Sequence, residues 1–378
     1  MNLRRLKAEP LSEFKKLTIG EFLMKNICVI GAGGTGQCFA ADMSLAGHAV
    51  SIYDDRKDRR DEIRQAGGIT LTGGGRTGTA HPRVCDSAEQ ALDGAELVVV
   101  CAVAHRHETL AKTCAAHLRD GQTLLISAGS GASLLFDREI RAARRLSAEQ
   151  THDVTLGELE GNLYPCRRTH PARIVMAFPP ARRMVAALPA VDTPRLQAAL
   201  DGILETSPAS NVLETALNSP NVVIHLMASL LNLGAVEQSH GEYRLYETGL
   251  TPGVLAMLDA MNMEKERLFA AWGWTPRSPM GHMRHVARQD AFPELNAFRS
   301  LIGPTDAEHR YLTEDASTCV CLMADTGRLA EVETPLADSL LLLAGALHGR
   351  DYAHEGRTLA SLGLGTLSKD MVNARLRG

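Results

Sequence analysis

A glycine-rich turn between a short apolar segment and a helical pattern constrains the fold of this chain more than any other feature. Residues 27–30 are apolar, a helical pattern runs over about 34–46, and a second apolar segment at 49–53 ends on Asp54. The turn carries a G-x-G-x-x-G pattern formed by Gly31, Gly33 and Gly36. Strand, glycine turn, helix and strand in this order predict a βαβ unit of the Rossmann type.

Each glycine has a separate role if this turn binds a dinucleotide. Gly31 permits a tight turn, Gly33 lets the backbone approach a diphosphate, and Gly36 lets the helix pack closely on the sheet. The helix N-terminus directs free N–H groups and the positive end of its dipole at the phosphates. We therefore expect the cofactor to contact the residues of the turn, which are Gly31, Ala32, Gly33, Gly34, Thr35 and Gly36.

Asp54 bears on the identity of the dinucleotide. It follows Gly31 at close to the ~20-residue spacing expected of a carboxylate that binds a ribose 2′-hydroxyl. A carboxylate there repels the 2′-phosphate of NADP, so the sequence favours NAD. Arg56 begins a basic run that either accepts this phosphate, which keeps NADP open, or forms a solvated loop.

Length, net charge and cysteine pattern indicate the number of domains, the kind of partner and the location of the protein. A length of 378 residues suggests two domains, and a net charge of −4 does not favour a nucleic-acid partner. The eight cysteines are scattered, and no apolar stretch has the length or flanks of a membrane span or a secretory signal. We expect a cytoplasmic protein with small-molecule partners and no metal site, and we leave a homodimer open.

The element pattern divides the chain into an extension and two domains. Residues 1–23 show no clear core pattern and are treated as an N-terminal extension. Strands and helices alternate over residues 24–192, with the last strands expected around 153–159 and 173–177, which predicts a mostly parallel sheet covered on both faces. A strand ending at Ser127 places that residue at the carboxyl edge of the sheet, where ligands bind. Residues 193–378 carry long 3.6-residue periodicities, roughly over 195–204, 220–238, 252–271, 313–326 and 335–347, so we expect an all-helical second domain. Three of these segments have a proline just inside a plausible start, at Pro220, Pro252 and Pro335, each preceded by a Ser or Thr that can cap the helix.

A helix expected over 220–238 carries a polar stripe on an otherwise apolar surface. Four polar residues recur at spacings of four, four and three, namely Asn221, His225, Ser229 and Asn232. A buried stripe of this kind needs polar partners or a cleft, because unpaired polar groups cost ~1–3 kcal/mol each. His225 is the member that exchanges a proton near neutral pH. Periodicity alone does not separate a catalytic His225 from a structural one.

Several segments, read together and in this order, resemble the octopine/nopaline (opine) dehydrogenase family over about residues 25–370. They are the dinucleotide unit, Leu163-Tyr164-Pro165-Cys166-Arg167, Asn218-Ser219-Pro220-Asn221 leading to His225, Tyr246-Glu247-Thr248-Gly249, Arg310-Tyr311-Leu312-Thr313-Glu314-Asp315, and Gly356-Arg357-Thr358-Leu359. Members couple an amino acid to a 2-keto acid, often pyruvate, and reduce the imine with NAD(P)H. The resemblance therefore implies a site between a Rossmann domain and a helical domain.

The resemblance also implies residue roles. His225 would be the general acid and base, and Asp315, expected in the first turn of a helix after Thr313, would orient its ring. Arg310 would bind a substrate carboxylate or bridge His225 and Asp315. Asn221, Arg167 and Ser127 are the remaining candidates for substrate binding.

Two other functions remain open on the same architecture. One is a 2-hydroxy-acid or ketopantoate-type reductase, because a Rossmann domain with a helical domain does not determine the chemistry. The other is a nucleotide-binding protein without turnover. Residues 272–305 show no pattern that we can assign, and the identity of the substrates stays open.

Overall fold

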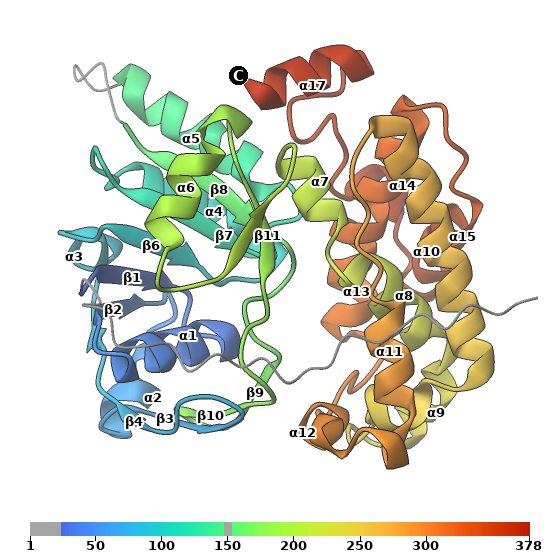
Figure 1. Cartoon of the computed structure of the whole chain (residues 1–378), viewed down its shortest axis with the longest axis horizontal. Helices are drawn as coiled ribbons and strands as arrows, with labels where there is room; N and C mark the ends of the chain where they lie inside the picture. Colours follow the sequence, from blue (N-terminus) through green and yellow to red (C-terminus); the bar gives the residue numbers. More distant parts are fainter. Residues whose placement is uncertain (1–23, 147–152) are drawn as a thin grey trace, which may run out of the picture.

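The computed structural model describes residues 24–146 and 153–378, so the predicted N-terminal extension lies outside the described residues. Two halves lie side by side, one built on β-sheets and one built of helices (Figure 1). This arrangement agrees with the α/β plus all-α fold expected from the sequence. Among the described residues, none of the helices combines the length and apolar character needed to cross a bilayer.

The main sheet has eight strands. Their order across the sheet is β12 (Thr206–Pro208), β11 (Arg183–Ala187), β8 (Thr155–Leu159), β7 (Thr123–Ser127), β6 (Leu97–Val100), β1 (Asn26–Ile30), β2 (Ala49–Tyr53) and β5 (Arg83–Val84). All neighbouring pairs are parallel except β11 with β8. The first βαβ unit is as expected, with Ile27 opposite Val50 on one side and Leu97 on the other.

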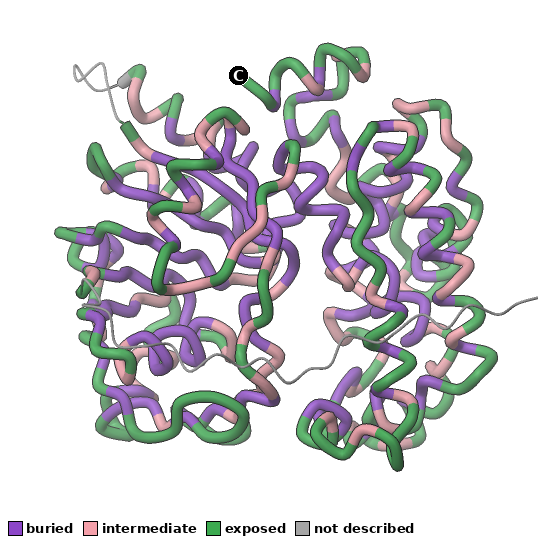
Figure 2. Tube along the Cα trace, viewed as in Figure 1, coloured by how far each residue is buried: buried purple, intermediate pink, exposed green. Residues whose placement is uncertain are grey.

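Helices cover both faces of this sheet. Successive side chains of each central strand point to opposite faces, so each face packs into its own core. Cys28 and Ile30 join a core with the helices of one layer, whereas Ile27 and Val29 join a core with those of the other. The first layer contains α3 (Ala88–Leu92), α4 (His107–Ala115), α5 (Ala132–Leu146) and α7 (Val212–Leu217). The second contains α1 (Gly34–Leu45) and α6 (Thr193–Leu200), and α2 (Lys57–Gln65) follows β2. The central strands are largely buried, whereas the covering helices also carry exposed residues (Figure 2).

A second, four-stranded sheet lies on the α1 side and was not foreseen. Its order is β4 (Gly78–Ala80), β3 (Ile69–Gly73), β10 (Arg173–Met176) and β9 (Cys166–His170). The strand expected around 173–177 therefore belongs to this sheet and pairs with β3 about a hundred residues earlier. Through β9 the second sheet brings the backbone of Arg168 close to Gly34 of the glycine turn.

The sheet half extends beyond residue 192, where the sequence analysis placed its end. The helix expected at 195–204 is α6, which packs on β8 and β11, and β12 then pairs with β11. The boundary at 192 was wrong because a helix that returns the chain to a sheet has the same periodicity as a helix of the second domain. The helical half begins after α7, which packs on β8 and β11.

The helical half surrounds α8 (Asn221–Leu231), which is mostly buried and packs against α10 and α13. The other α- and π-helices are α9 (Leu233–Gln238), the π-helix η3 (Leu245–Gly249), α10 (Pro252–Trp272), α11 (Met280–Ala287), α12 (Asn296–Arg299), α13 (Arg310–Asp315), the π-helix η6 (Ala316–Val320), α14 (Cys321–Leu329), α15 (Pro335–His348), α16 (Tyr352–Glu355) and α17 (Lys369–Arg377). Pro252 and Pro335 each begin a helix, as expected, and the Thr251 hydroxyl accepts from the Val254 N–H.

Candidate active site between the two halves

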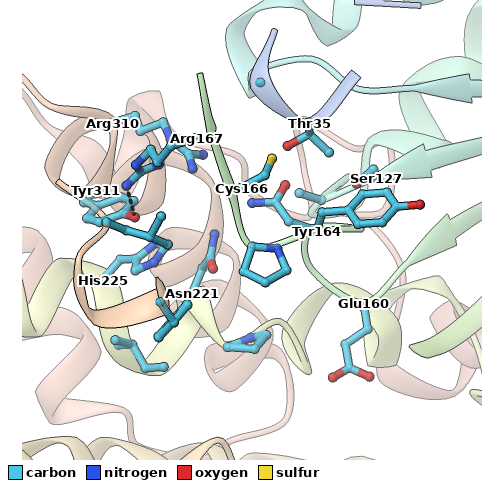
Figure 3. A pocket seen from close by; sticks show the side chains of 18 of the residues that line it. Thr35, Ser127, Glu160, Tyr164, Cys166, Arg167, Asn221, His225, Arg310 and Tyr311 are labelled. Atoms are coloured by element: carbon cyan, nitrogen blue, oxygen red, sulfur yellow. Dashed lines mark hydrogen bonds between the residues drawn. The ribbon is translucent and has the colours of Figure 1, made fainter. Parts of the chain in front are cut away.

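A cavity of about 920 Å³ lies where the two halves meet. The glycine turn, the end of β7 and the start of β9 line it from the sheet half. Elements α8, η3, α11 and α13 line it from the helical half. Figure 3 shows side chains from both halves pointing toward this space.

The geometry of the glycine turn fits a dinucleotide diphosphate. Gly31 has φ +102°, and a side chain there would collide with the carbonyl of Cys101. A side chain at Gly36 would collide with the carbonyl of Gly31, so both glycines are required for packing. Gly33 faces open space, and no side chain caps the N-terminus of α1 or places an acid in its first turn. Free N–H groups at an open helix N-terminus are suited to bind phosphate.

The predicted cofactor residues divide into two groups. Gly33, Gly34 and Thr35 line the cavity, whereas Gly31, Ala32 and Gly36 support the turn from behind. Asp54 also supports it, because its carboxylate accepts from the N–H of Ala32 at 2.6 Å and from that of Arg56 at 3.0 Å. These bonds leave lone pairs on the carboxylate for a ribose hydroxyl.

Arg56 is a weaker candidate for a 2′-phosphate than the sequence suggested. Its guanidinium pairs with Asp58 at 2.5 Å, both side chains are exposed, and the residue does not line the cavity. Arg59 and Arg168 do line it, and Glu62 accepts from both, at 3.3 and 2.5 Å. Any basic recognition of NADP would thus fall to these two arginines.

His225 and Asp315 meet at the helical side of the cavity. His225 Nδ1 lies 2.7 Å from Asp315 Oδ2, and both side chains are buried. Asp315 also accepts from Asn221 Nδ2 and Cys319 Sγ, each at 3.4 Å. A carboxylate only accepts, so Nδ1 of His225 carries a hydrogen and Nε2 is free to exchange a proton.

Asp315 does not lie in the first turn of a helix, contrary to the expectation. Helix α13 already begins at Arg310, and His309 caps it by accepting from the Tyr311 N–H at 3.2 Å. Asp315 is the last residue of α13, and the helical backbone continues through η6, so this anion does not lie at the N-terminus of its own helix. Direct hydrogen bonds therefore stabilise this carboxylate.

Two tyrosines that the sequence analysis gave no role complete the surroundings of His225. The hydroxyl of Tyr246 lies 2.9 Å from His225 Nε2. The ring of Tyr311 stacks on the imidazole, with centroids 3.7 Å apart and planes 15° apart. Both residues fall in segments that resemble the opine dehydrogenases, which was the available signal for them.

Burial lowers the pKa of His225 below its ordinary value of 6.5. Asp315 opposes this shift by charge and hydrogen bonding, and the positive charges of Arg310 and Arg167 add to it. The histidine is therefore neutral at pH 7 in the free protein. In that form Nδ1 donates to Asp315 and Nε2 accepts from the Tyr246 hydroxyl.

The two predicted arginines differ in how firmly they are held. Arg167 donates to the Tyr311 hydroxyl and to the carbonyl of Ile302, each at 2.9 Å, so it ties β9 to the helical half. Arg310 lies over the Tyr311 ring at 5.4 Å, lines the cavity, and donates to no acceptor among the described residues. It does not bridge His225 and Asp315, which bond directly, and its guanidinium is free to bind an anion.

The remaining candidates also reach the cavity. Asn221 lines it beside Asp315, and Ser127 lines it from the end of β7. The Ser127 hydroxyl accepts from the N–H of Leu163 at 3.2 Å, which ties β7 to the segment before β9. In the described parts of the chain, His, Cys, Asp and Glu side chains form no group that could hold a metal ion.

Comparisons with known proteins agree with this architecture. Family models match for the α-helical domain of NAD/NADP octopine/nopaline dehydrogenases over residues 208–348 and for ketopantoate reductase PanE/ApbA over residues 27–158. An octopine dehydrogenase structure with NADH and L-arginine has a TM-score of 0.66 at 17% identity, covering 92% of this chain and 98% of that one.

Two curated relatives cover almost the whole chain. Vitopine synthase of Allorhizobium ampelinum is 23% identical over 94% of this chain and 100% of that protein. Opine dehydrogenase of Arthrobacter sp. (strain 1C) is 30% identical over 91% of this chain and 96% of that protein. On this similarity, the chain belongs to the opine dehydrogenase family of NAD(P)-dependent oxidoreductases.

Proposed function

We propose that this protein condenses the amine of an amino acid with the carbonyl of a 2-keto acid such as pyruvate and reduces the product to an N-(carboxyalkyl)amino acid. The observation that carries the proposal is the buried His225–Asp315 pair, which faces the dinucleotide turn across one cavity. Similar structures of octopine dehydrogenase hold NADH with L-arginine or with pyruvate, and one of yersinopine dehydrogenase holds NADP⁺. NAD is the preferred cofactor, because Asp54 has the spacing from Gly31 expected of a carboxylate that binds a ribose hydroxyl.

The chemistry requires a proton at two points. The keto oxygen takes a proton when the amine attacks the carbonyl and gives a carbinolamine, and the carbinolamine oxygen takes a second proton to leave as water. Bound NAD(P)H supplies the hydride that reduces the resulting imine carbon. A positioned acid and base accelerates such proton transfers by ~100- to 10,000-fold. His225 has the side chain and the location for this role.

Asp315 and Tyr246 assist His225 in different ways. Asp315 holds the Nδ1 hydrogen, so it orients the ring and stabilises the imidazolium that forms when Nε2 takes a proton. The Tyr246 hydroxyl bonds to Nε2 and also lines the cavity, so it can relay a proton between His225 and the substrate oxygen. Arg310 binds a substrate carboxylate with its free N–H groups.

A reductase of 2-hydroxy acids or of ketopantoate type is the second candidate. The match of residues 27–158 to ketopantoate reductase favours it, although that match covers only the sheet half. The two functions differ in their requirement for an amine. A reductase of this type oxidises NADH with the keto acid alone, whereas an opine dehydrogenase requires the amino acid as well.

The test is NADH oxidation with pyruvate or 2-oxoglutarate, with and without pooled amino acids, followed by mass analysis of the product. Amine-dependent oxidation with an N-carboxyalkyl product supports the proposal. Oxidation without the amine supports the reductase. NADH binding without oxidation across a broad panel of acids and amines would indicate a nucleotide-binding protein without turnover.

A further inference from the structure

A second charged group lines the same cavity and has no part in the mechanism above. It consists of Glu160 and Arg183 from the sheet half and Arg277 from the loop between α10 and α11. Figure 3 shows Glu160 well apart from His225 and Arg310. The charges that act on Arg183 are those of Glu160 and Arg277, whereas Asp315, Arg310 and Arg167 act on His225. The cavity therefore has two separate charged ends.

Arg277 forms an ion pair at its end of the cavity. Its Nη1 donates to Glu160 Oε2 at 2.7 Å, and that oxygen also accepts from the N–H of Met184 at 3.2 Å. The backbone of Arg277 is held as well, because its N–H donates to Asn218 Oδ1 and its carbonyl accepts from Lys265 Nζ, each at 2.7 Å. Arg277 and Glu160 thus form a fixed ion pair.

Arg183 has no such partner. Its Nε is buried without a hydrogen-bond acceptor among the described residues, although the side chain lines the cavity. Burial lowers the pKa of Arg183, Glu160 opposes this shift, and the like charge of Arg277 adds to it. The buried ammonium of Lys265 contributes a further positive charge beside the same pair. Glu160 therefore acts on all three cations, and Glu266 acts on Lys265 as well. A desolvated guanidinium without an ion-pair partner of its own is unfavourable unless an anion joins it.

The walls beside this group are apolar. Phe178, Met283 and Phe298 line the cavity together with His282, whose ring lies edge-on to both phenylalanines. An apolar wall that leads to an unmatched arginine suits an aliphatic chain ending in an acid. It also strengthens the bond to that acid, because the local dielectric is low.

We propose that Arg183 binds a carboxylate at the distal end of a substrate, so that one of the two condensing partners is a dicarboxylic acid. The partner is either an amino acid of the glutamate type or a keto acid of the 2-oxoglutarate type, since both present the same group. The inference rests on the proposed function, which brings an amino acid and a keto acid into this cavity. The carboxylates beside the reacting carbons would use Arg310 at the other end.

The experiment compares matched substrates in two arms. The first pairs pyruvate with glutamate or with glutamine, and the second pairs a neutral amino acid with 2-oxoglutarate or with pyruvate. We expect kcat/KM to favour the dicarboxylic substrate in one arm, and that arm identifies the partner. In Arg183→Met the preference should fall by about 10- to 100-fold, as for the loss of a hydrogen bond to a charged group.

Arg182→Met is the matched control, because Arg182 precedes Arg183, is exposed and lies outside the cavity lining. It should keep the preference. Arg183→Gln, which keeps polarity but not charge, replaces the Met variant if thermal unfolding shows that the latter is not folded. Equal kcat/KM for both members of each arm, or a preference that survives in Arg183→Met and Arg183→Gln, overturns the inference.

A binding measurement separates failure of the inference from failure of the proposed function. If no pair of substrates gives amine-dependent oxidation, the proposed function is wrong. Calorimetric titration of the NADH complex with glutarate then still tests Arg183. Binding that is lost in the Arg183 variant but not in the Arg182 variant supports the anion site, and equal or absent binding refutes it.

Discussion

Replacing Asp315 by Asn tests the proposed acid and base pair most directly. The carboxylate accepts from His225 Nδ1 at 2.7 Å in a site where both side chains are buried. A hydrogen bond to a charged group contributes ~1.5–3 kcal/mol, and 1.4 kcal/mol corresponds to a factor of ten. Asp315→Asn should therefore lower kcat by about 10- to 150-fold.

His225→Asn provides the comparison, because it removes the titrating ring and leaves a donor for the buried Asp315. Loss of a general acid and base should lower kcat by ~100- to 10,000-fold. Asp315 acts through His225, so the double variant should be no slower than His225→Asn alone. Asp306→Asn is the control, since Asp306 is exposed and its carboxylate accepts only from the neighbouring Thr305 hydroxyl among the described residues.

The assay is steady-state NADH oxidation with saturating keto acid and amino acid. Cofactor binding by fluorescence and thermal unfolding verify that each variant is folded and binds NADH. Turnover of Asp315→Asn within about threefold of the parent would contradict the proposed role. A double variant that is slower than His225→Asn by the full factor measured for Asp315→Asn would show that the two residues act independently.

Four further predictions follow from the same geometry. Tyr246→Phe removes the hydroxyl 2.9 Å from His225 Nε2 and should lower kcat about 5- to 100-fold with unchanged NADH binding; an unchanged kcat excludes the relay. Arg310→Met should raise KM for the keto acid about 10- to 100-fold. If only the KM for NADH rises, this arginine binds the cofactor instead. Because burial lowers the pKa of His225, oxidation of the N-(carboxyalkyl)amino acid, which needs the neutral base, should be at its plateau above pH 6.5 and fall below that pKa. The rate of condensation, which needs the protonated form, should fall as pH rises. In His225→Asn neither reaction should keep the pH dependence that His225 causes. Burial, with a smaller effect of Arg357, lowers the pKa of His107 to about 3, so between pH 6.5 and 3 the folded state binds fewer protons than the unfolded state. The free energy of unfolding should then fall as the pH is lowered through this range, by up to ~1.4 kcal/mol per pH unit. Denaturant unfolding of His107→Gln should show a weaker dependence on pH.

Elements that depend on local pattern were predicted well. The helix expected over 252–271 is α10, Pro252–Trp272, with its proline at the first position and a left-handed Gly273 after its end. The glycine turn also has the required geometry, because the left-handed φ of Gly31 and the close packing of Gly36 follow from residue type. Such features involve hydrogen bonds and packing among residues close in the sequence.

Elements that depend on distant pairing were missed. The second sheet joins β3 to β10, and the polar sequence of β9, Cys-Arg-Arg-Thr-His, does not read as a strand on its own. The end of the sheet half was misplaced for the same reason, since only pairing with β11 shows that β12 belongs to the sheet.

Within the site, the sequence by itself determined which helix face carries His225 and which turn is shaped for a dinucleotide, because periodicity and glycine are local properties. The family resemblance pointed to Asp315. The tertiary structure decided that Nδ1 of His225 meets a carboxylate 90 residues away, that Tyr246 bonds to Nε2, and that Nε of Arg183 is buried without an acceptor among the described residues. Contacts of this kind depend on how α8, η3, α13 and β11 pack together, and residue spacing along one element carries no information about the packing of another.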